Sequence, residues 1–575
     1  MNLKKKIILS SLILTPTFAL PLIGASCQQN SYVELIIPFK TDDARYSVFK
    51  EIVAKYNEDK DSKMMNVSVV PFNNSSTPFQ RYIENDLEAN NHMMPDLIFY
   101  YPSMANVLAR YNKLINFKEE VKNIKFLEKL LPENRNLGIP NVQKDDKFLL
   151  PFGRSIDLLI INKFVFGFIF DKIEKESKKS LISPDKTKTK LLISIKDYFE
   201  KLKVNNADKV SALNNVLKFK VNNDYVTKTD FNFTDEIFTY SDKLENASYK
   251  LSMSFEKEIK KNIYPLYLSH TANHFFKKAF DLADGNFDNY MLKYGKEKEN
   301  NFKLNYSNLK DKKSSLFKTF ETIYNEFKEL RIHDSIGLRD KWREKWAGHG
   351  YELPLGLNIM MTIISSHSYD SIFNLANEVS FQSSLTIDDF IFLPSPLKKS
   401  EGQKSSNFLL QGPSLMGVKI KPSREKHVKS FVKWLYNKKM NFNKTYQSDD
   451  FVKDITPIEY FNYKNKYIYP TQEYLNKFET IKNKQNAALI SSFELFKEAI
   501  KNNDYHAFEE PVDAYSNRFR NDLELAMSYF LFDDQKNPST NKDDFKANAK
   551  AYDLIKRMVK ISSADYIGTI DELEK

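Results

Sequence analysis

Strand-like and helix-like patterns alternate over residues 32–111, and this alternation restricts the fold more than any other feature of the chain. Residues 33–39 (VELIIPF), 67–72 (VSVVPF) and 95–101 (PDLIFYY) are short apolar runs of strand length. Residues 49–56, between the first two runs, carry apolar side chains at helical spacing, which predicts an amphipathic helix. Strands that alternate with helices form parallel sheets, and such sheets bind ligands beyond the carboxyl ends of their strands.

Local signals place some of the expected helix ends. Thr77 and Gln80 have the spacing of a capping box, and Pro78 suits the first helical position, so we expect a helix to begin at Pro78. Ser103 is expected to cap the helix that follows the third strand. Apolar residues between positions 316 and 330 predict a further amphipathic helix.

The first 27 residues have the character of an export signal. Lysines at positions 4–6 precede an uncharged, mostly apolar run over 7–25, the pattern of a secretory signal peptide. The run ends in Gly-Ala-Ser before Cys27, which resembles the lipobox of bacterial lipoproteins, although Gly24 stands where leucine is usual. We therefore expect a signal peptide over 1–26, a tether over 27–31 that carries acyl chains on Cys27, and a location on the outer face of the cell membrane.

Cysteine content and charge exclude several classes of protein. Cys27 is the single cysteine of 575 residues, so no disulfide stabilises the exported part and its stability must come from an apolar core. The net charge of +11 is the small excess of 86 basic over 75 acidic residues. Nucleic-acid binding requires basic residues clustered on one face, and the lysine runs here are short and scattered, so no nucleic-acid partner is expected.

The order of these patterns resembles the extracellular solute-binding proteins of ABC importers, and in particular the carbohydrate and glycerol-phosphate binders and the mycoplasma surface lipoproteins built on the same plan. A strand that ends Val-Pro-Phe and a third strand that begins Pro-Asp-Leu-Ile carry the first part of the resemblance. Later segments agree with it: residues 149–155 resemble the first crossing between lobes, 357–363 the returning strand, and 393–396 and 411–418 a proline-flanked strand and a small-residue ligand loop.

This resemblance implies an α/β, two-lobed periplasmic-binding-protein-like fold. Each lobe is expected to be a mainly parallel sheet flanked by helices, with a helical C-terminal part and lysine-rich insertions. The first lobe is expected to comprise residues 32–150 and 358–436, and the second lobe 151–357 and 437–575. The implied function is that of a monomeric, lipid-anchored solute-binding protein that delivers a sugar, oligosaccharide or glycerol-phosphate-like solute to ABC permease subunits.

Candidate ligand-binding residues follow the strands or lie in the resembling segments. Their hydroxyl, amide, aromatic and charged groups suit a polar solute, although each is equally typical of a cap or turn that faces water. Those placed by position are Lys40, Thr41, Asn74, Ser75, Tyr100 and Tyr101, and those added by the resemblance are Arg154, Ser155, Ser365, Ser366, Gln411, Gly412 and Ser414. Arg154 either grips a carboxylate or phosphate in bidentate fashion or forms a salt bridge at the hinge.

A search for catalytic patterns favours binding over chemistry. The chain contains no Walker, Rossmann, nucleophile-elbow or His-Glu-x-x-His motif. His270 and His274 have the spacing of zinc ligands but no third ligand nearby in sequence. We therefore expect no enzyme activity, metal or cofactor. Two alternatives stay open: a surface adhesin on the same scaffold without a transport role, and a secreted hydrolase.

Lipidation of Cys27 is directly testable. In cells that express the full chain, labelled palmitate should be incorporated into the wild-type protein and lost in Cys27→Ser, because the thiol is the acceptor of the lipid. Undiminished labelling of the variant would contradict the assignment.

Overall fold

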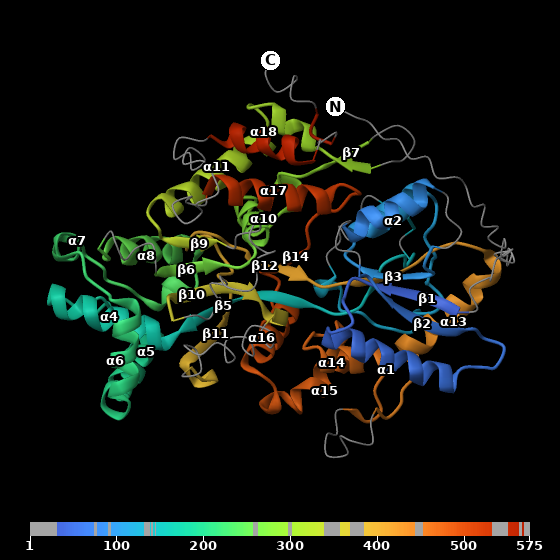
Figure 1. Ribbon diagram of the computed structural model, residues 1–575, viewed down its shortest axis with the longest axis horizontal. Coiled ribbons are helices and arrows are strands. Elements are labelled where there is room, and N and C mark those ends of the chain that lie inside the picture. The colour runs from blue at the N-terminus through green and yellow to red at the C-terminus, as the bar shows by residue number, and fades with distance from the viewer. Residues whose placement is uncertain are drawn as a thin grey trace, which may run out of the picture.

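The structure is a computed structural model (Figure 1), and it describes residues 32–73, 78–89, 94–131, 139, 142–143, 145–256, 263–296, 302–338, 357–368, 385–442, 452–531, 550–562 and 566–568. The expected signal peptide with Cys27, and the candidate residues Asn74 and Ser75, lie outside the described residues. Among the described helices, none combines the length and the apolar character needed to cross a membrane.

The smaller of the two main sheets has five strands in the order β2-β1-β3-β13-β4. Its strands are β1 (Tyr32–Ile37), β2 (Asn66–Pro71), β3 (Leu97–Tyr100), β4 (Leu150–Pro151) and β13 (Ser414–Gly417). β1 pairs in parallel with β2 and β3, as the alternating pattern predicts, whereas β13 runs antiparallel to both β3 and β4.

Helices cover both faces of this sheet (Figure 1). Leu35 and Ile37 pack into the core cluster that contains the buried face of α1 (Ala44–Asp59), while Ile36 packs with α2 (Phe79–Glu88) and α3 (Ser103–Arg110). Alternate residues of a strand point to opposite faces, so a continuous apolar run is what a strand buried on both faces requires. The helices α13 (Pro422–Asn437) and α14 (Pro457–Lys464) pack on the α1 side.

The expected helix ends are nearly correct. Helix α2 begins at Phe79, one residue after the predicted start, with Pro78 in the cap position. Ser103 is the first residue of α3 and not its cap, and its hydroxyl lies 3.5 Å from the amide oxygen of Gln80.

The larger sheet has seven strands, six of them in the order β14-β12-β5-β10-β6-β9, with β11 paired to β5. The strands are β5 (Ser155–Asn162), β6 (Tyr264–Leu268), β9 (Ile336–Leu338), β10 (Ile359–Ser365), β11 (Phe390–Pro394), β12 (Ser406–Gln411) and β14 (Tyr505–Phe508). β5 is antiparallel to β10, β11 and β12, whereas β6, β9 and β10 are parallel. The expected α/β class with mainly parallel sheets is confirmed, because all the described strands of each sheet run in one direction except β13 in the smaller sheet and β5 in the larger one.

Helices surround the larger sheet, with α10 and α17 above it and α16 below it in Figure 1. They are α4 (Lys163–Ser177), α5 (Lys190–Asn205), α6 (Ala207–Leu217), α7 (Asn223–Lys228), α8 (Ser241–Met253), α10 (Thr271–Leu282), α11 (Ser315–Ile332), α15 (Gln472–Glu479), α16 (Ala487–Lys501), α17 (Ser516–Leu531) and α18 (Ala551–Ser562). β7 (Tyr294–Lys296) and β8 (Phe302–Leu304) form a separate short hairpin.

Two segments belong to a different sheet from the one that the sequence predicts. Residues 358–411 were expected in the first lobe, yet β10, β11 and β12 pair in the larger sheet. Conversely, α14 packs against α1 and α13 of the smaller sheet, although it falls within 437–575. Both strand and helix partners are set by pairing between residues far apart in the chain, which a local pattern does not record.

Three described segments cross between the sheets side by side. Residues 152–154 link β4 to β5, residues 412–413 link β12 to β13, and residues 465–468 leave α14. The Phe152 amide donates to the Pro413 carbonyl at 3.2 Å, and Arg154 and Ile468 exchange backbone hydrogen bonds of 2.8 and 2.9 Å. The expected first crossing at 149–155 is therefore where the chain passes, but the return uses Gly412-Pro413 and not 357–363.

Gly412 makes this close crossing possible. Its φ of +140° lies in the region that only glycine adopts readily, and an added Cβ would stand 2.0 Å from the Gly153 carbonyl oxygen. A side chain at this position would therefore force both crossing segments apart.

Gly412→Ala should lower the free energy of unfolding by about 1–3 kcal/mol or more, because backbone strain adds to the clash with Gly153. The matched control is Gly402→Ala, since a Cβ added at Gly402 would meet no atom within 4 Å. Urea denaturation of the three proteins would measure the difference. Equal stability of the two variants would contradict the role given to Gly412.

Candidate functional site

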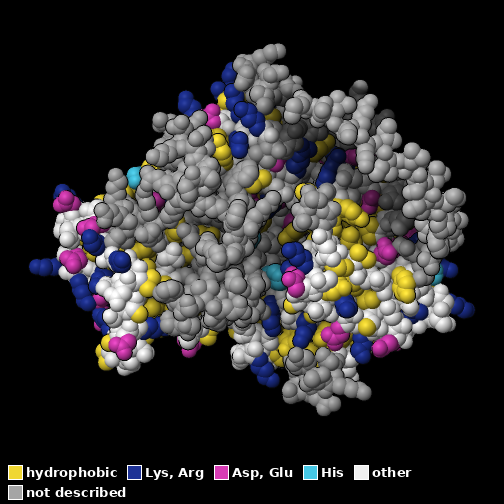
Figure 2. Space-filling view, viewed as in Figure 1, with side chains coloured by type: hydrophobic (Ala, Val, Ile, Leu, Met, Phe, Trp, Pro, Cys, Tyr) yellow, Lys and Arg dark blue, Asp and Glu magenta, His cyan; other side chains and the backbone are white. Residues whose placement is uncertain are grey.

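A cavity of about 460 Å³ lies beside the three crossing segments. Tyr101, which follows β3 of the smaller sheet, lines it together with Ser155, Ser365, Gln411 and Gly412, which begin or end strands of the larger sheet or follow them. These five are the candidates from the sequence that the structure brings together. Figure 2 shows basic, acidic and histidine side chains next to one another near the middle of one face of the molecule. The volume is within the range of small-molecule sites.

Three of the other candidates that follow strands do not line this cavity. Lys40 and Thr41 lie on the exposed turn before α1. Tyr100 lies behind the lining, where its hydroxyl accepts a hydrogen bond of 3.1 Å from the amide of Asn517, a lining residue. Tyr100 therefore supports the cavity wall from the smaller sheet.

Arg154 is buried in the crossing, with 1% of its surface exposed, and it does not line the cavity. Its guanidinium group donates to the carbonyl oxygens of Gly153 at 3.0 Å and Leu130 at 3.4 Å. Because Arg154 does not reach the cavity, the expected binding of a solute anion by its guanidinium group is wrong. The two contacts are hydrogen bonds to backbone carbonyl oxygens, and so they differ from the salt bridge that was the alternative expectation. The long side chain fills the space beneath Gly412, to which its Nη1 is the nearest side-chain atom.

Two further candidates serve the interior. Ser366 is buried, and its hydroxyl accepts a 3.3 Å hydrogen bond from the backbone amide of Ile156. Ser414 is fully buried within β13. Hydroxyl groups after strands are as useful for satisfying buried backbone groups as for binding a ligand, and the sequence does not separate the two uses.

Arg45 and His367 join the two sheets across one end of the cavity. Asp43 caps α1 and holds Arg45 in a fork, with contacts of 2.9 Å to Nε and 2.5 Å to Nη2. The remaining Nη1 lies 2.9 Å from Nε2 of His367, which follows β10 in the turn Ser366–Ser368. The guanidinium group also lies 3.7 Å from the centre of the Phe39 ring. Residues 322 positions apart therefore form one contact between the sheets.

The partners of His367 require a neutral imidazole. Its Nδ1 lies 3.1 Å from the carbonyl oxygen of Asn465, which only accepts, so Nδ1 carries the proton and Nε2 accepts from Arg45. The ring also stacks on Tyr467, with centroids 4.2 Å apart. Burial, reinforced by the positive charge of Arg45, lowers the pKa of His367 to about 4.

A buried carboxylate orients several side chains on the opposite wall. Asp157, on β5, accepts hydrogen bonds from the amide of Gln411 at 2.6 Å and from the amide of Asn273 at 3.1 and 3.3 Å. The oxygen of the Asn273 amide in turn accepts from Arg520 at 2.5 Å, and Arg520 is paired with Glu510. Burial raises the pKa of Asp157 to about 6, and the two amide donors oppose that rise.

The segment that leads into α17 closes one side of the cavity. The Gln80 amide of α2 donates to the Ala514 carbonyl at 2.7 Å, and the Asn106 amide of α3 donates to the Val512 carbonyl at 3.1 Å. Asn517 adds its contact with Tyr100. Side chains of the smaller sheet and of its flanking helices therefore hold the segment before α17, and α17 packs on the side of the larger sheet.

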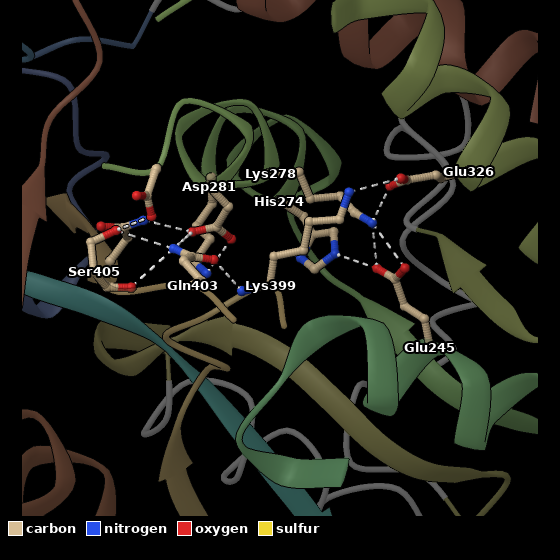
Figure 3. Close-up of polar contacts among 11 residues, drawn as sticks. Glu245, His274, Lys278, Asp281, Glu326, Lys399, Gln403 and Ser405 are labelled. Carbon is tan, nitrogen blue, oxygen red and sulfur yellow. Dashed lines mark hydrogen bonds and ion pairs between the residues drawn. The ribbon is translucent and has the colours of Figure 1, made fainter. Parts of the chain in front are cut away.

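A second group of buried charges lies along α10, away from the cavity (Figure 3). Lys278 contacts Glu245 at 2.8 Å and Glu326 at 2.6 Å, and Lys399 reaches Glu326 at 3.4 Å. His274 lies 3.4 Å from Glu245, which accounts for one of its ring nitrogens without a metal. Although burial raises the pKa of Glu245, Lys278 and His274 hold it at about 2. These pairs join α8, α10 and α11, and the described residues contain no cluster of three or more potential metal ligands.

Most of the polar and charged lining of the cavity was not predicted from the sequence. Arg45, His367, Tyr467, Asn273, Arg520 and Glu524 all line the cavity. The position of His367 directly after Ser365 and Ser366 was a usable signal, because it follows the same strand. For Arg45 and Arg520 the sequence holds no comparable signal, since both lie on helices whose orientation depends on the whole fold.

The fold and the cavity define a two-sheet α/β protein with a small-molecule-sized site between its sheets. Two family models match the chain. The one described as "Putative mycoplasma lipoprotein, C-terminal region" matches residues 409–531, and the one described as "Mycoplasma MG185/MG260 protein" matches residues 212–348. The expected likeness to mycoplasma lipoproteins is thereby confirmed.

Lipoproteins of Mycoplasma pneumoniae (strain ATCC 29342 / M129 / Subtype 1) are similar in sequence. One is 28% identical over 141 residues, which cover 24% of this chain and 18% of the relative. Another is 22% identical over 343 residues, which cover 50% of this chain and 42% of the relative. The matched regions therefore span less than half the length of these relatives.

Solved structures with a similar course of the chain include a cyclic alpha-maltosyl-1,6-maltose binding protein from Arthrobacter globiformis, at 12% identity and a TM-score of 0.48 over 94% of this chain and 99% of that chain. UgpB from Mycobacterium tuberculosis in complex with glycerophosphocholine has 9% identity and a TM-score of 0.45 over 92% and 98% of the two chains.

The Arg45–His367 contact predicts a dependence of stability on pH. The unfolded chain binds a proton on His367 below its ordinary pKa of 6.5, whereas the folded protein does so only below about 4. The contribution of this contact to the free energy of unfolding is therefore complete above pH 6.5 and declines as the pH falls towards 4.

His367→Gln keeps an amide oxygen that can accept from Arg45 but does not titrate. The melting temperature of wild type minus that of the variant should therefore shrink between pH 7.5 and pH 4.5 in parallel thermal scans. A constant difference would show that His367 is not held neutral. Groups that titrate in both proteins, such as Asp157, cancel in this comparison.

Proposed function

We propose that this protein is a lipid-anchored solute-binding protein on the outer face of the cell membrane, and that it delivers a sugar, oligosaccharide or glycerol-phosphate-like solute to an ABC importer. The observation that carries the proposal is the cavity of about 460 Å³, which is lined by side chains of both sheets next to the crossing segments. A ligand in this position contacts both halves at once. Closure of the two halves is then favoured by the solute itself.

The composition of the wall supports a polar solute. Ser155, Ser365 and Gln411 offer hydroxyl and amide groups, and Tyr101 presents a ring that is 56% exposed. Sugars combine hydroxyl groups with apolar ring faces, so they use both kinds of partner. No catalytic role is assigned to these residues, and the protein is proposed to bind its solute without covalent chemistry.

The anchor and the partner belong to the same proposal. Acylated Cys27 holds the protein at the membrane, since two or more acyl chains anchor far better than one. Permease subunits receive the solute there, and the similarity to mycoplasma lipoproteins supports this location. A surface adhesin would bind host surfaces and no small solute, and a hydrolase would consume the solute, so the experiment below separates these alternatives.

Tyr101→Ala should weaken binding of the solute about five- to tenfold, because a stacked aromatic ring contributes about 0.5–1.5 kcal/mol beyond its buried area. Tyr111→Ala is the matched control, since Tyr111 is 39% exposed at the end of α3 and does not line the cavity. Titration calorimetry after a thermal-shift screen of sugars, polyol phosphates and peptides would measure the effect. If none of these compounds at millimolar concentration produced a thermal shift, the proposal would be overturned. An equal loss of affinity in both variants would show that the solute binds elsewhere.

A further inference from the structure

Residues 509–515, which join β14 to α17 beside the cavity, contact both halves of the protein, where a half is one sheet with the helices that pack on it (Figure 1). We call this segment the strap. Both of its ends belong to the larger half, because β14 pairs with β12 and α17 packs on α10. Its middle reaches the smaller half, where Ala514 is buried in the same apolar cluster as Phe79 and Leu108. The strap therefore connects the halves outside the three crossing segments.

The hairpin of β7 and β8, which lies between α10 and α11 in the chain, anchors the strap to the larger half. Asp513 is 1% exposed, and its carboxylate accepts from the backbone amide of Leu304 at 2.9 Å and from the hydroxyl group of Ser516 at 3.1 Å. The Tyr294 hydroxyl group donates to the Val512 carbonyl and accepts from the Val512 amide, both at 2.9 Å. Separation on this side would take donors away from a buried carboxylate, which is costly.

The hydrogen bonds between the strap and the smaller half are replaceable. The amide nitrogen of Gln80 donates to the Ala514 carbonyl at 2.7 Å and also to Oε1 of Glu84 at 2.9 Å, so it keeps a partner when the strap leaves. The Val512 carbonyl accepts from the Asn106 amide at 3.1 Å and keeps its hydrogen bond from the β7–β8 hairpin. The Ala514 carbonyl and the Asn106 amide are uncovered by the same movement and can bond to water.

Two further contacts on this side involve groups that are not fully buried. The guanidinium group of Arg110 lies 4.6 Å from the centre of the Tyr515 ring, and Arg110 is exposed. Asn517, which donates to the Tyr100 hydroxyl group at 3.1 Å, is half-buried and lines the cavity. The smaller half is therefore the side from which the strap separates at the lower cost.

We propose that Gln80 and Asn106 form a clasp on the strap, and that release of this clasp opens the side of the cavity through which the solute passes. The strap stays with the larger half, and α2 and α3 separate from it. With the clasp closed, Val512 is held in place as part of the cavity wall, so the binding form is prepared before the solute arrives. This inference rests on the proposed function, because it assigns a route to the solute.

The single cysteine of the chain makes release measurable. The Cys27→Ser chain has no thiol, so Ala514→Cys adds one reporter at a position that is 4% exposed while the clasp is closed. Its rate of reaction with a maleimide is proportional to the population of the released form, even where that population is small. Gln80→Met together with Asn106→Leu should raise this rate on the order of tenfold or more, because two hydrogen bonds that favour the closed clasp are lost.

Two controls separate release from a general loss of stability. Asn57→Leu also removes two hydrogen bonds, of 2.9 and 2.8 Å to the backbone of Val67, but within the smaller half, so it should change the labelling at position 514 by less than about twofold. Ala247→Cys places the reporter in α8, where Ala247 is fully buried and labelling measures global unfolding. Unchanged labelling at position 514 in the clasp variant, or equal acceleration at positions 514 and 247, would overturn the clasp.

The single variants cover the case in which the double variant does not fold. Gln80→Met and Asn106→Leu should each raise the labelling rate about threefold or more, because each removes one of the two hydrogen bonds. No acceleration in either single variant would equally overturn the clasp.

The outcomes distinguish the two proposals, because labelling is measured without any solute. Binding of a sugar, polyol phosphate or peptide with unchanged labelling would leave the proposed function standing and overturn the clasp alone. Faster labelling of the clasp variant without binding of any of these compounds would support the clasp as a contact that opens, and would overturn the proposed function together with the route for the solute.

Discussion

The backbone contact at the crossing between the sheets determines where everything else can lie. Residues 152–154 are hydrogen-bonded on one edge to Pro413 and on the other to Ile468, and the missing side chain of Gly412 lets two of these segments touch. The cavity adjoins this crossing, and Gly412 is part of its wall. The buried Arg154 belongs to the same unit, because its guanidinium group donates to the carbonyl oxygen of Gly153 within the crossing and to that of Leu130 beside it.

Local structure was largely predictable from the sequence. The apolar face of α1 and the continuous apolar runs of β1 and β3 follow from periodicity, because burial on one helical face or on both sheet faces leaves a direct record in the chain. The sheet to which a strand belongs leaves no such record. The apolar sequence of β10 is compatible with a strand of either sheet. Its place is decided by pairing with β5 and β6, which lie up to about two hundred residues away in the chain.

The residues of the candidate site were likewise predicted in part. Tyr101 was predicted because it follows a strand, where side chains of an α/β protein converge. Ser155, Ser365 and Gln411 were predicted because they lie in segments that resemble those of solute-binding proteins. Arg45 and Arg520 were missed because their positions follow from how α1 and α17 pack. Asp157 was missed for another reason: it is hidden behind the wall and acts on the amides of Gln411 and Asn273, so no position-based rule points to it.

The arrangement of the three crossing segments also has a mechanical consequence. Hydrogen bonds tie them into a ribbon three chains wide, with 152–154 in the middle. Such a ribbon bends readily out of its own plane but resists shear and twist within it, because those motions stretch hydrogen bonds on both edges. Such a ribbon favours rotation of the two sheets about it over sliding of one sheet past the other, and the Arg45–His367 contact links the sheets beside it. A rotation about the ribbon would keep the two walls of the cavity in the same register.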